Sequence, residues 1–152
     1  MKNYNYLLKI EYDGTRFVGW QFQKNGQSIQ ERIEKILSKL LNSKIKIIGA
    51  GRTDKGVHAL GQHANFITNK KIENKKKFLN SLNFFLSKYL ISIIKISSKS
   101  LFFNSRFNAK ERTYKYIITN RESYLSLDRN RAWHVKSKLD INLLKKGAKL
   151  FE

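Results

Sequence analysis

The sequence predicts an α+β protein with a complete first half and an incomplete second half. Residue patterns typical of strands and helices follow one another over residues 1–98 in the order β-α-β-β-α-β. One strand pattern and one helix pattern follow in residues 99–152, which is too little to enclose a core. The order in the first half is the split βαβ unit of ferredoxin-like folds, whose antiparallel sheet carries two helices on one face. We therefore expect a ferredoxin-like half over 1–98 and the start of a second α+β half over 99–152.

The first strand and the first helix are the clearest elements. Residues 6–12 (YLLKIEY) favour a strand, and Asp13-Gly14 favours a turn at its end. Ser28 and Glu31 have the spacing of a capping box, in which the serine hydroxyl accepts a hydrogen bond from the glutamate amide. Apolar residues at helical spacing follow and predict an amphipathic helix. They are Ile29, Ile33, Ile36, Leu37, Leu40 and Leu41.

Three strands and one helix are expected in the rest of the first half. Residues 45–48 are rich in β-branched side chains and favour a short strand, and a third strand is expected over 62–68. Apolar residues recur at helical spacing over 78–90, and residues 91–96 favour a fourth strand. The aromatic residues of the second helix fit a core role better than a stacking role.

The second half begins with an alternating segment. Residues 112–119 (RTYKYIIT) predict a strand with Tyr114 and Tyr116 on the same face. Residues 120–131 form a charged loop, and Asp140 is suited to cap the next helix. The apolar positions of that helix are Leu143, Leu144, Ala148 and Phe151.

Charge and composition indicate an RNA-binding or DNA-binding protein. The 152 residues contain 31 Lys and Arg against 11 Asp and Glu, a formal net charge of +20. Such an excess favours phosphate binding, although abundant Lys, Asn and Ile without proline also fit an A+T-rich coding sequence. The 41% of apolar residues is enough for a core, which excludes wholesale disorder.

Several classes of site and location are disfavoured. The absence of cysteine excludes disulfides, thiolate zinc sites and cysteine nucleophiles. His58, His63 and His134 lack metal-ligand spacing, so surface or core roles are expected for them. No apolar run reaches the roughly 20 residues of a membrane span, and the start lacks a signal-type stretch. We expect a soluble cytoplasmic protein that binds neither metal nor membrane.

The loop at residues 49–59 (GAGRTDKGVHA) holds the strongest candidate for chemistry. Asp54 lies between Arg52 and Lys55 on a segment with three glycines, in a chain with only four aspartates. Neighbouring cations favour the ionised form of a carboxylate. Asp54 is therefore either a nucleophile or base that works beside a polyanion, or one partner of a structural ion pair with Arg52.

Three blocks of residues resemble the tRNA pseudouridine synthase A family. They occur in the order and at the approximate spacing of that family, which makes the likeness specific. The blocks are residues 11–14 (EYDG) with 17–21 (FVGWQ), residues 51–59 (GRTDKGVHA), and residues 106–116 (RFNAKERTYKY).

This resemblance implies a function and roles for three residues. Members isomerise uridine to pseudouridine in the anticodon stem-loop of tRNA, without cofactor or metal, and act as homodimers with the site between two related halves. The resemblance implies that Asp54 is the catalytic nucleophile, that Arg52 pairs with Asp54 and assists base extrusion, and that Tyr114 packs against the target base. From the residues alone, Asp54 has three open roles: attack at C1′, attack at C6, or removal of a C2′ proton.

The family continues for roughly another hundred residues, about the size of a small domain. Two alternatives to the full activity therefore stay open, a non-catalytic RNA-binding fragment and a pseudouridine synthase with another RNA target.

Other residues allow a structural and a functional interpretation. Tyr114 fits a strand core as well as a base contact, and Trp20 fits either an RNA contact or an anchor for the first loop. The basic segment 70–77 fits a phosphate-binding or a solvated surface. The same holds for a second group of cations. This group is Arg106, Lys110, Arg112 and Lys115.

Overall fold

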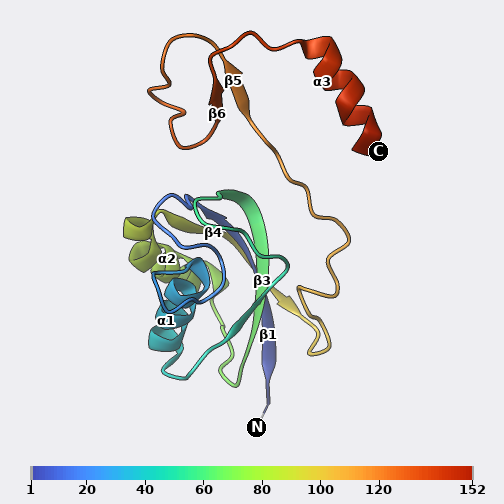
Figure 1. Cartoon of the computed structure of the whole chain (residues 1–152). Helices are drawn as coiled ribbons and strands as arrows, with labels where there is room; N and C mark the ends of the chain where they lie inside the picture. Colours follow the sequence, from blue (N-terminus) through green and yellow to red (C-terminus); the bar gives the residue numbers. More distant parts are fainter. Residues whose placement is uncertain (1, 152) are drawn as a thin grey trace. The chain divides into compact units, whose positions relative to one another are not determined.

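The computed structural model describes residues 2–151, which fall into two compact units divided between Arg112 and Thr113. The first unit contains a four-stranded sheet and two α-helices (Figure 1). The strands are β1 (Tyr4–Tyr12), β2 (Ile47–Gly49), β3 (Ala59–Thr68) and β4 (Ile91–Lys99). The helices are α1 (Ile29–Leu41) and α2 (Lys75–Leu86), and a 3₁₀ turn, η1 (Ser87–Tyr89), follows α2.

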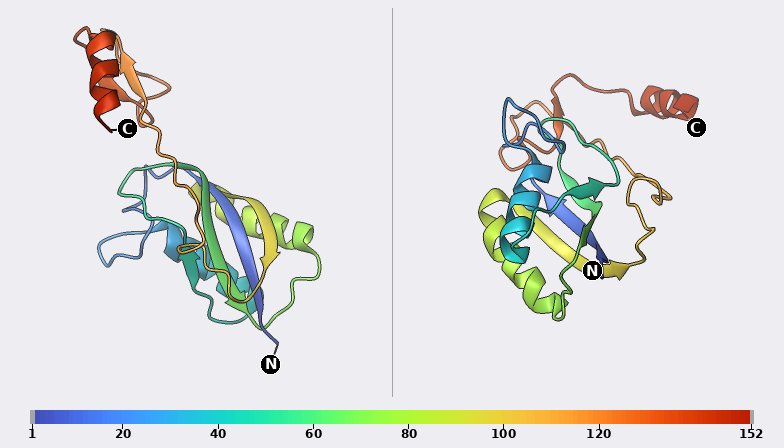
Figure 2. Two further views of the ribbon diagram at one scale, coloured as in Figure 1. Left: turned by 90° about the vertical axis from the view of Figure 1, so that its right-hand side faces the viewer. Right: turned by 90° about the horizontal axis from the view of Figure 1, so that it is seen from below.

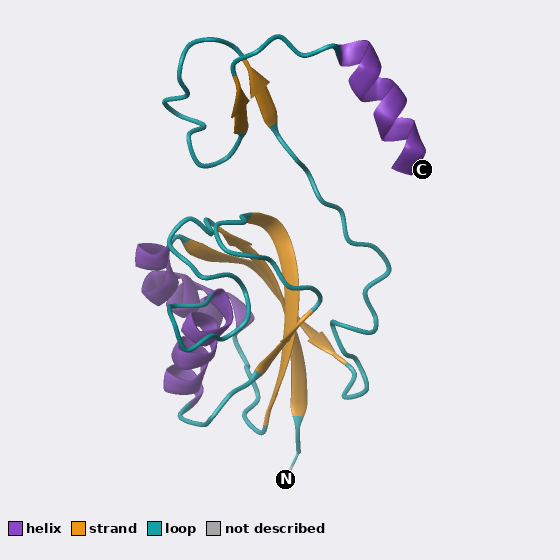
Figure 3. Ribbon diagram, viewed as in Figure 1, coloured by secondary structure: helices purple, strands orange, loops and turns teal. Residues whose placement is uncertain are grey.

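The sheet has the order β2-β3-β1-β4, and every neighbouring pair is antiparallel. With the element order β-α-β-β-α-β, this is the ferredoxin-like arrangement that the sequence predicts. Both helices lie on the same side of the sheet, as Figures 2 and 3 show. Neither α1 nor α2 therefore lies on the other face.

The core lies between the sheet and the helices. Alternate residues of β1, such as Leu8 and Ile10, are fully buried, whereas Lys9 and Glu11 are exposed on the opposite face. This alternation follows from the two-residue period of a strand. From α1 the core receives the predicted stripe, in which Ile29, Ile33 and Leu37 are fully buried.

The first helix begins where the capping box predicts. Ser28 caps it, and its hydroxyl accepts a hydrogen bond from the Glu31 amide at 3.2 Å. At the other end Asn42 adopts the left-handed conformation, with φ at 44°, and its amide bonds back to the last turn.

The predicted strand over residues 112–119 is wrong in its extent. Only Ile118–Asn120 (β5) is a strand, and it pairs in parallel with Trp133–Val135 (β6). Residues 113–117 are not part of a strand. Alternation favours an extended backbone, but a strand exists only where a second segment pairs with its amides and carbonyls.

The second unit has a capped helix but no buried core. Asp140 caps α3 (Ile141–Ala148), as predicted, and accepts hydrogen bonds from the amides of Asn142 and Leu143. A 3₁₀ turn, η2 (Lys149–Phe151), follows. No residue from 113 to 151 is buried. The expectation that this part does not enclose a core is confirmed.

Candidate active site

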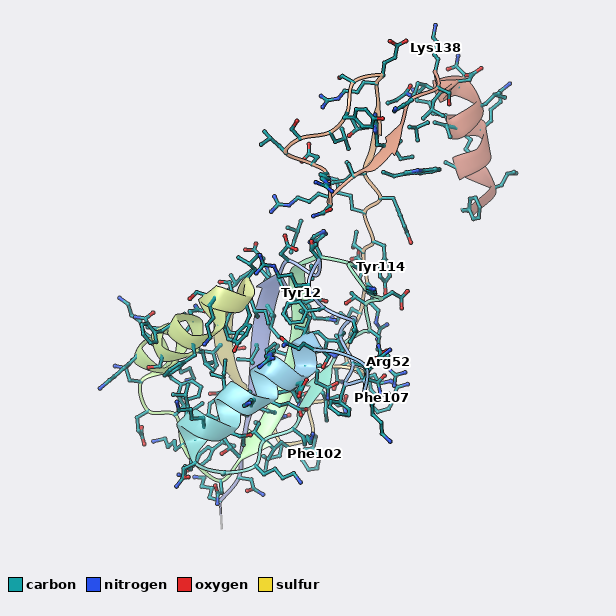
Figure 4. The ribbon with its side chains drawn as sticks, turned by 60° about the vertical axis from the view of Figure 1, so that its left-hand side comes forward. Tyr12, Arg52, Phe102, Phe107, Tyr114 and Lys138 are labelled. Carbon is teal, nitrogen blue, oxygen red and sulfur yellow. The ribbon has the colours of Figure 1, made fainter. Side chains whose placement is uncertain are left out.

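Asp54 lies on the loop that joins β2 to β3, here called the aspartate loop (residues 50–58). Asp54 and Arg52 are both exposed, and Figure 4 shows Arg52 at the outer edge of the first unit. Within residues 2–151, no ion pair of 4.0 Å or less joins the two side chains. The carboxylate is thus accessible, and its pairing with Arg52 stays a prediction.

Thr53, the residue before Asp54, is held by hydrogen bonds to both its backbone and its side chain. The Thr53 carbonyl accepts a hydrogen bond from the Trp20 amide at 2.9 Å. The Thr53 hydroxyl lies 2.8 Å from the Tyr12 hydroxyl at the end of β1. A third constraint comes from Gly19, where φ is +121° and an added Cβ would lie 2.7 Å from the Thr53 carbonyl oxygen. The backbone next to Asp54 is therefore held in place, although the Asp54 carboxylate is exposed.

The far end of the aspartate loop is fastened to the turn after β1. The Gly14 amide donates a hydrogen bond to Nδ1 of His58 at 3.2 Å, and Asp13 Oδ1 lies 3.3 Å from the same nitrogen. The backbones come so close that a Cβ on Gly14 would lie 2.0 Å from the Val57 carbonyl oxygen. His58 thus has a structural role, in line with its predicted surface or core position.

Burial of Tyr12 keeps its hydroxyl protonated. Removal from water raises the pKa of Tyr12, which outweighs the opposite effect of its side-chain hydrogen bonds with Thr53 and Gln62. The Tyr12 hydroxyl therefore holds the loop as a neutral hydrogen-bonding group and not as a base.

Trp20 anchors the first loop. Its side chain is buried at 2% exposure and packs beside Tyr12, with ring centres 6.0 Å apart. It also contacts Gly49, where an added Cβ would lie 2.6 Å from the indole nitrogen. Of the two interpretations of Trp20, the anchor fits the structure and the RNA contact does not.

Residues 100–112 cross the helix-free side of the sheet and belong to the first unit. Two buried asparagines hold this segment, here called the strap. Asn65 on β3 accepts a hydrogen bond from the Ser105 amide at 2.8 Å and donates to the Asn5 side chain at 3.0 Å. Asn5 donates in turn to the carbonyls of Ser100 and Phe103.

Arg112, the last residue of the strap, reaches the start of the aspartate loop. Its Nε donates to the Ala50 carbonyl at 2.9 Å, and its guanidinium also donates to the Arg106 carbonyl at 2.9 Å. Arg112 therefore has a structural role. The sequence suggested only a phosphate-binding or a solvated role for it. The strap also explains why the first unit extends to residue 112, whereas the predicted boundary lies at 98.

Tyr114 lies in the second unit and is 62% exposed. It is neither in a strand nor in a core, so the structural interpretation of this residue is wrong. Its predicted role as the ring that packs on the target base stays a prediction.

Sequence reasoning gave no role to Tyr12 or Thr53 and did not foresee the contact of Arg112 with the aspartate loop, although all three lie in the family-like blocks. The available signal was a hydroxyl group at the end of the buried face of β1, at Tyr12. Residues 2–151 contain no group of three or more His, Asp or Glu side chains that could hold a metal ion. None of the helices in that range is long and apolar enough to cross a membrane.

A family model described as tRNA pseudouridine synthase matches residues 9–108, which include Arg52 and Asp54. The chain belongs to the tRNA pseudouridine synthase family. It is 51% identical to tRNA pseudouridine synthase A of Pelagibacter ubique over 146 residues, 96% of this chain and 59% of that protein. It is 42% identical to the protein of the same name from Neorickettsia sennetsu, over 94% of this chain and 59% of the relative.

A third member, from Thermoanaerobacter sp. strain X514, is 41% identical over 95% of this chain and 58% of its own length. The chain thus spans somewhat less than three fifths of these curated relatives of the tRNA pseudouridine synthase family.

Proposed function

We propose that this chain supplies the catalytic aspartate of a tRNA pseudouridine synthase, and that Asp54 acts on uridine in the anticodon stem-loop of tRNA. The observation that carries the proposal is an exposed carboxylate on a loop fixed at Thr53 and at His58, inside the segment that matches the family. An accessible carboxylate oxygen on a backbone that is held in place suits a group that must meet a reacting atom at a defined position.

The reaction needs few components. The N1–C1′ bond breaks, the uracil turns, and C5 joins C1′ while the C5 proton leaves and N1 takes up a proton. Atoms balance without a redox partner. A carboxylate that forms a covalent intermediate would divide the change into two easier steps.

Arg52 and Tyr114 have supporting roles in this proposal. A uridine in a stem must leave the stack before its glycosidic bond is accessible. In this proposal Arg52, which is exposed and two residues from Asp54, pairs with Asp54 and assists the extrusion of the base. Tyr114, exposed and two residues beyond the anchored Arg112, offers a ring on which the base can stack.

We expect Asp54→Asn to abolish product formation and to leave RNA affinity within about twofold, because the substitution removes a reacting oxygen and keeps the shape. The measurement is tritium release from an anticodon stem-loop labelled at C5 of uridine, together with RNA binding by fluorescence anisotropy. Asp128→Asn, also an exposed carboxylate, is the matched control and should behave as the wild type.

An Asp54→Asn protein that released tritium at the wild-type rate would disprove the assignment. The second candidate function is RNA binding without turnover, which is favoured by the 58–59% of the relatives' length that the chain spans. RNA binding by the wild-type chain with no tritium release would favour that alternative. Homodimer formation and a cytoplasmic location belong to the proposal, and the former is checked by light scattering.

A further inference from the structure

Basic side chains are aligned on the face of the sheet that carries no helix. In the strand register, Lys9 on β1 lies directly opposite His63 on β3 and directly opposite Lys95 on β4. All three are exposed. Because neighbouring strands are about 4.8 Å apart, the three residues span about 10 Å across the sheet. Lys99, four residues after Lys95 on β4, adds a third lysine.

Two side chains of this group have contacts that show where they lie. A Cβ added to Gly61 would lie 3.1 Å from Cε and 3.9 Å from Nζ of Lys9, so Lys9 leans over the strand that carries His63. Lys99 has its ammonium 5.1 Å from the centre of the Phe103 ring in the strap. We call Lys9, His63, Lys95 and Lys99 the basic cluster.

This arrangement is electrostatically unfavourable without a ligand. Like charges directly opposite one another destabilise an antiparallel pair. The ion pairs of residues 2–151 include none of the four cluster residues, and Glu11 is the neighbouring carboxylate on the same face of β1. Partial burial and the charges of Lys9 and Lys99 lower the pKa of His63, against the smaller effect of a hydrogen bond with the Gly61 backbone. An anion would relieve this repulsion.

Hydrogen bonds join the strand that carries His63 to the start of the aspartate loop. The His63 carbonyl accepts a hydrogen bond from the Ala50 amide at 2.7 Å, and the neighbouring Gln62 side chain donates to the Gly51 carbonyl at 2.8 Å. RNA with a nucleotide at Asp54 would therefore have its adjoining backbone within reach of these cations.

We propose that the basic cluster binds phosphates of the RNA backbone and that His63 takes up a proton when they bind. The proposal rests on RNA being the substrate, but it concerns contacts away from the reacting uridine. In the free protein, partial burial and the charges of Lys9 and Lys99 lower the pKa of His63, which favours the neutral imidazole. A phosphate beside the ring stabilises the imidazolium, so affinity must rise as pH falls below neutrality.

The first test distinguishes the effect of the basic cluster on RNA affinity from the effect of the protein's overall positive charge. Lys9→Gln with Lys95→Gln is compared with Lys145→Gln with Lys146→Gln, two exposed lysines of α3, so that both proteins lose two charges. Binding of a fluorescein-labelled RNA stem-loop is measured between about 50 and 200 mM KCl. We expect the slope of log K against log salt to fall by about 1.4–1.8 in the cluster variant, from 0.7–0.9 per phosphate contact. In the control we expect little change.

The second test measures how RNA affinity depends on pH, which reports on the protonation of His63. The wild-type affinity should increase from pH 7 to pH 5.5, and His63→Gln should remove that increase. His63→Lys, which keeps a charge at all these pH values, should restore the affinity and stay independent of pH. His134→Gln is the matched histidine control and should keep the wild-type pH dependence.

Equal losses in the two lysine variants, or an unchanged pH profile in His63→Gln, would overturn the proposal. Since all substituted cluster residues are exposed, circular dichroism should show an intact fold in each variant. Tritium release by the wild-type chain reports on the proposed function separately, so either proposal can fail alone. A wild-type chain that bound no RNA would reject both.

Discussion

Asp54 owes its position to the residues around it and not to a partner of its own carboxylate. Thr53 is bonded through its carbonyl to Trp20 and through its hydroxyl to Tyr12. Four residues further on, His58 is bonded to the turn after β1. A charged side chain on a glycine-containing loop would otherwise lose conformational entropy on binding a substrate, and these contacts reduce that cost.

Gly14→Ala should destabilise the first unit by about 1–3 kcal/mol, the usual cost of overpacking, because the new methyl group would meet the Val57 carbonyl. Urea unfolding measures the loss. Gly147→Ala is the matched control, since nothing lies within 4 Å of its added Cβ and alanine favours a helix. Equal stability of the two variants would show that the turn and the aspartate loop separate easily.

At the scale of elements, the strap links distant parts of the first unit. It follows β4 and is held over β1 and β3 by Asn5 and Asn65. Through Arg112 it then reaches the carbonyl of Ala50 beside β2. One irregular segment thus spans the sheet and ends at the candidate site, two residues before Tyr114.

Asn65→Ala should release the strap, because the Ser105 amide and the Asn5 side chain lose their buried partner, at a cost of about 1–3 kcal/mol. Limited trypsin digestion should then cut faster after Arg106 and Lys110. Asn80→Ala, on the exposed side of α2, serves as the control and should be cut at the wild-type rate. Unchanged cutting in Asn65→Ala would mean that other contacts hold the strap.

In the molecule as a whole, the buried apolar residues are confined to one of the two units. Every buried apolar residue of the described chain lies between Tyr6 and Ile96, so the hydrophobic contribution to folding comes from the first unit. Apolar side chains of the second unit, such as Trp133 and Phe151, are exposed.

Residues 1–112 alone should therefore unfold in urea with a midpoint close to that of the 152-residue chain, because the fragment keeps the whole core. The measurement is far-UV circular dichroism of both proteins across a urea series. A fragment that is unfolded in buffer would disprove the assignment of stability to the first unit.

Local patterns predicted most elements of the first unit. The stripe of α1, its serine cap and the alternation in β1 are written in neighbouring residues, and the structure has them. The strand expected over 112–119 was wrong, because whether an extended segment becomes a strand depends on a partner elsewhere in the chain. The candidate residue Asp54 also came from the sequence, but its supports did not.

The α+β class, the order of the elements in the first half and the family-like blocks around Asp54 can all be read from neighbouring residues, because propensity, period and motif are local properties. Tertiary structure alone decided that Trp20 is an anchor, that the Asn5–Asn65 pair holds the strap, and that Lys9, His63 and Lys95 share one line across the sheet. These facts depend on strand register and on contacts between distant residues. Such contacts form only when the chain has lost the conformational entropy that loop closure costs.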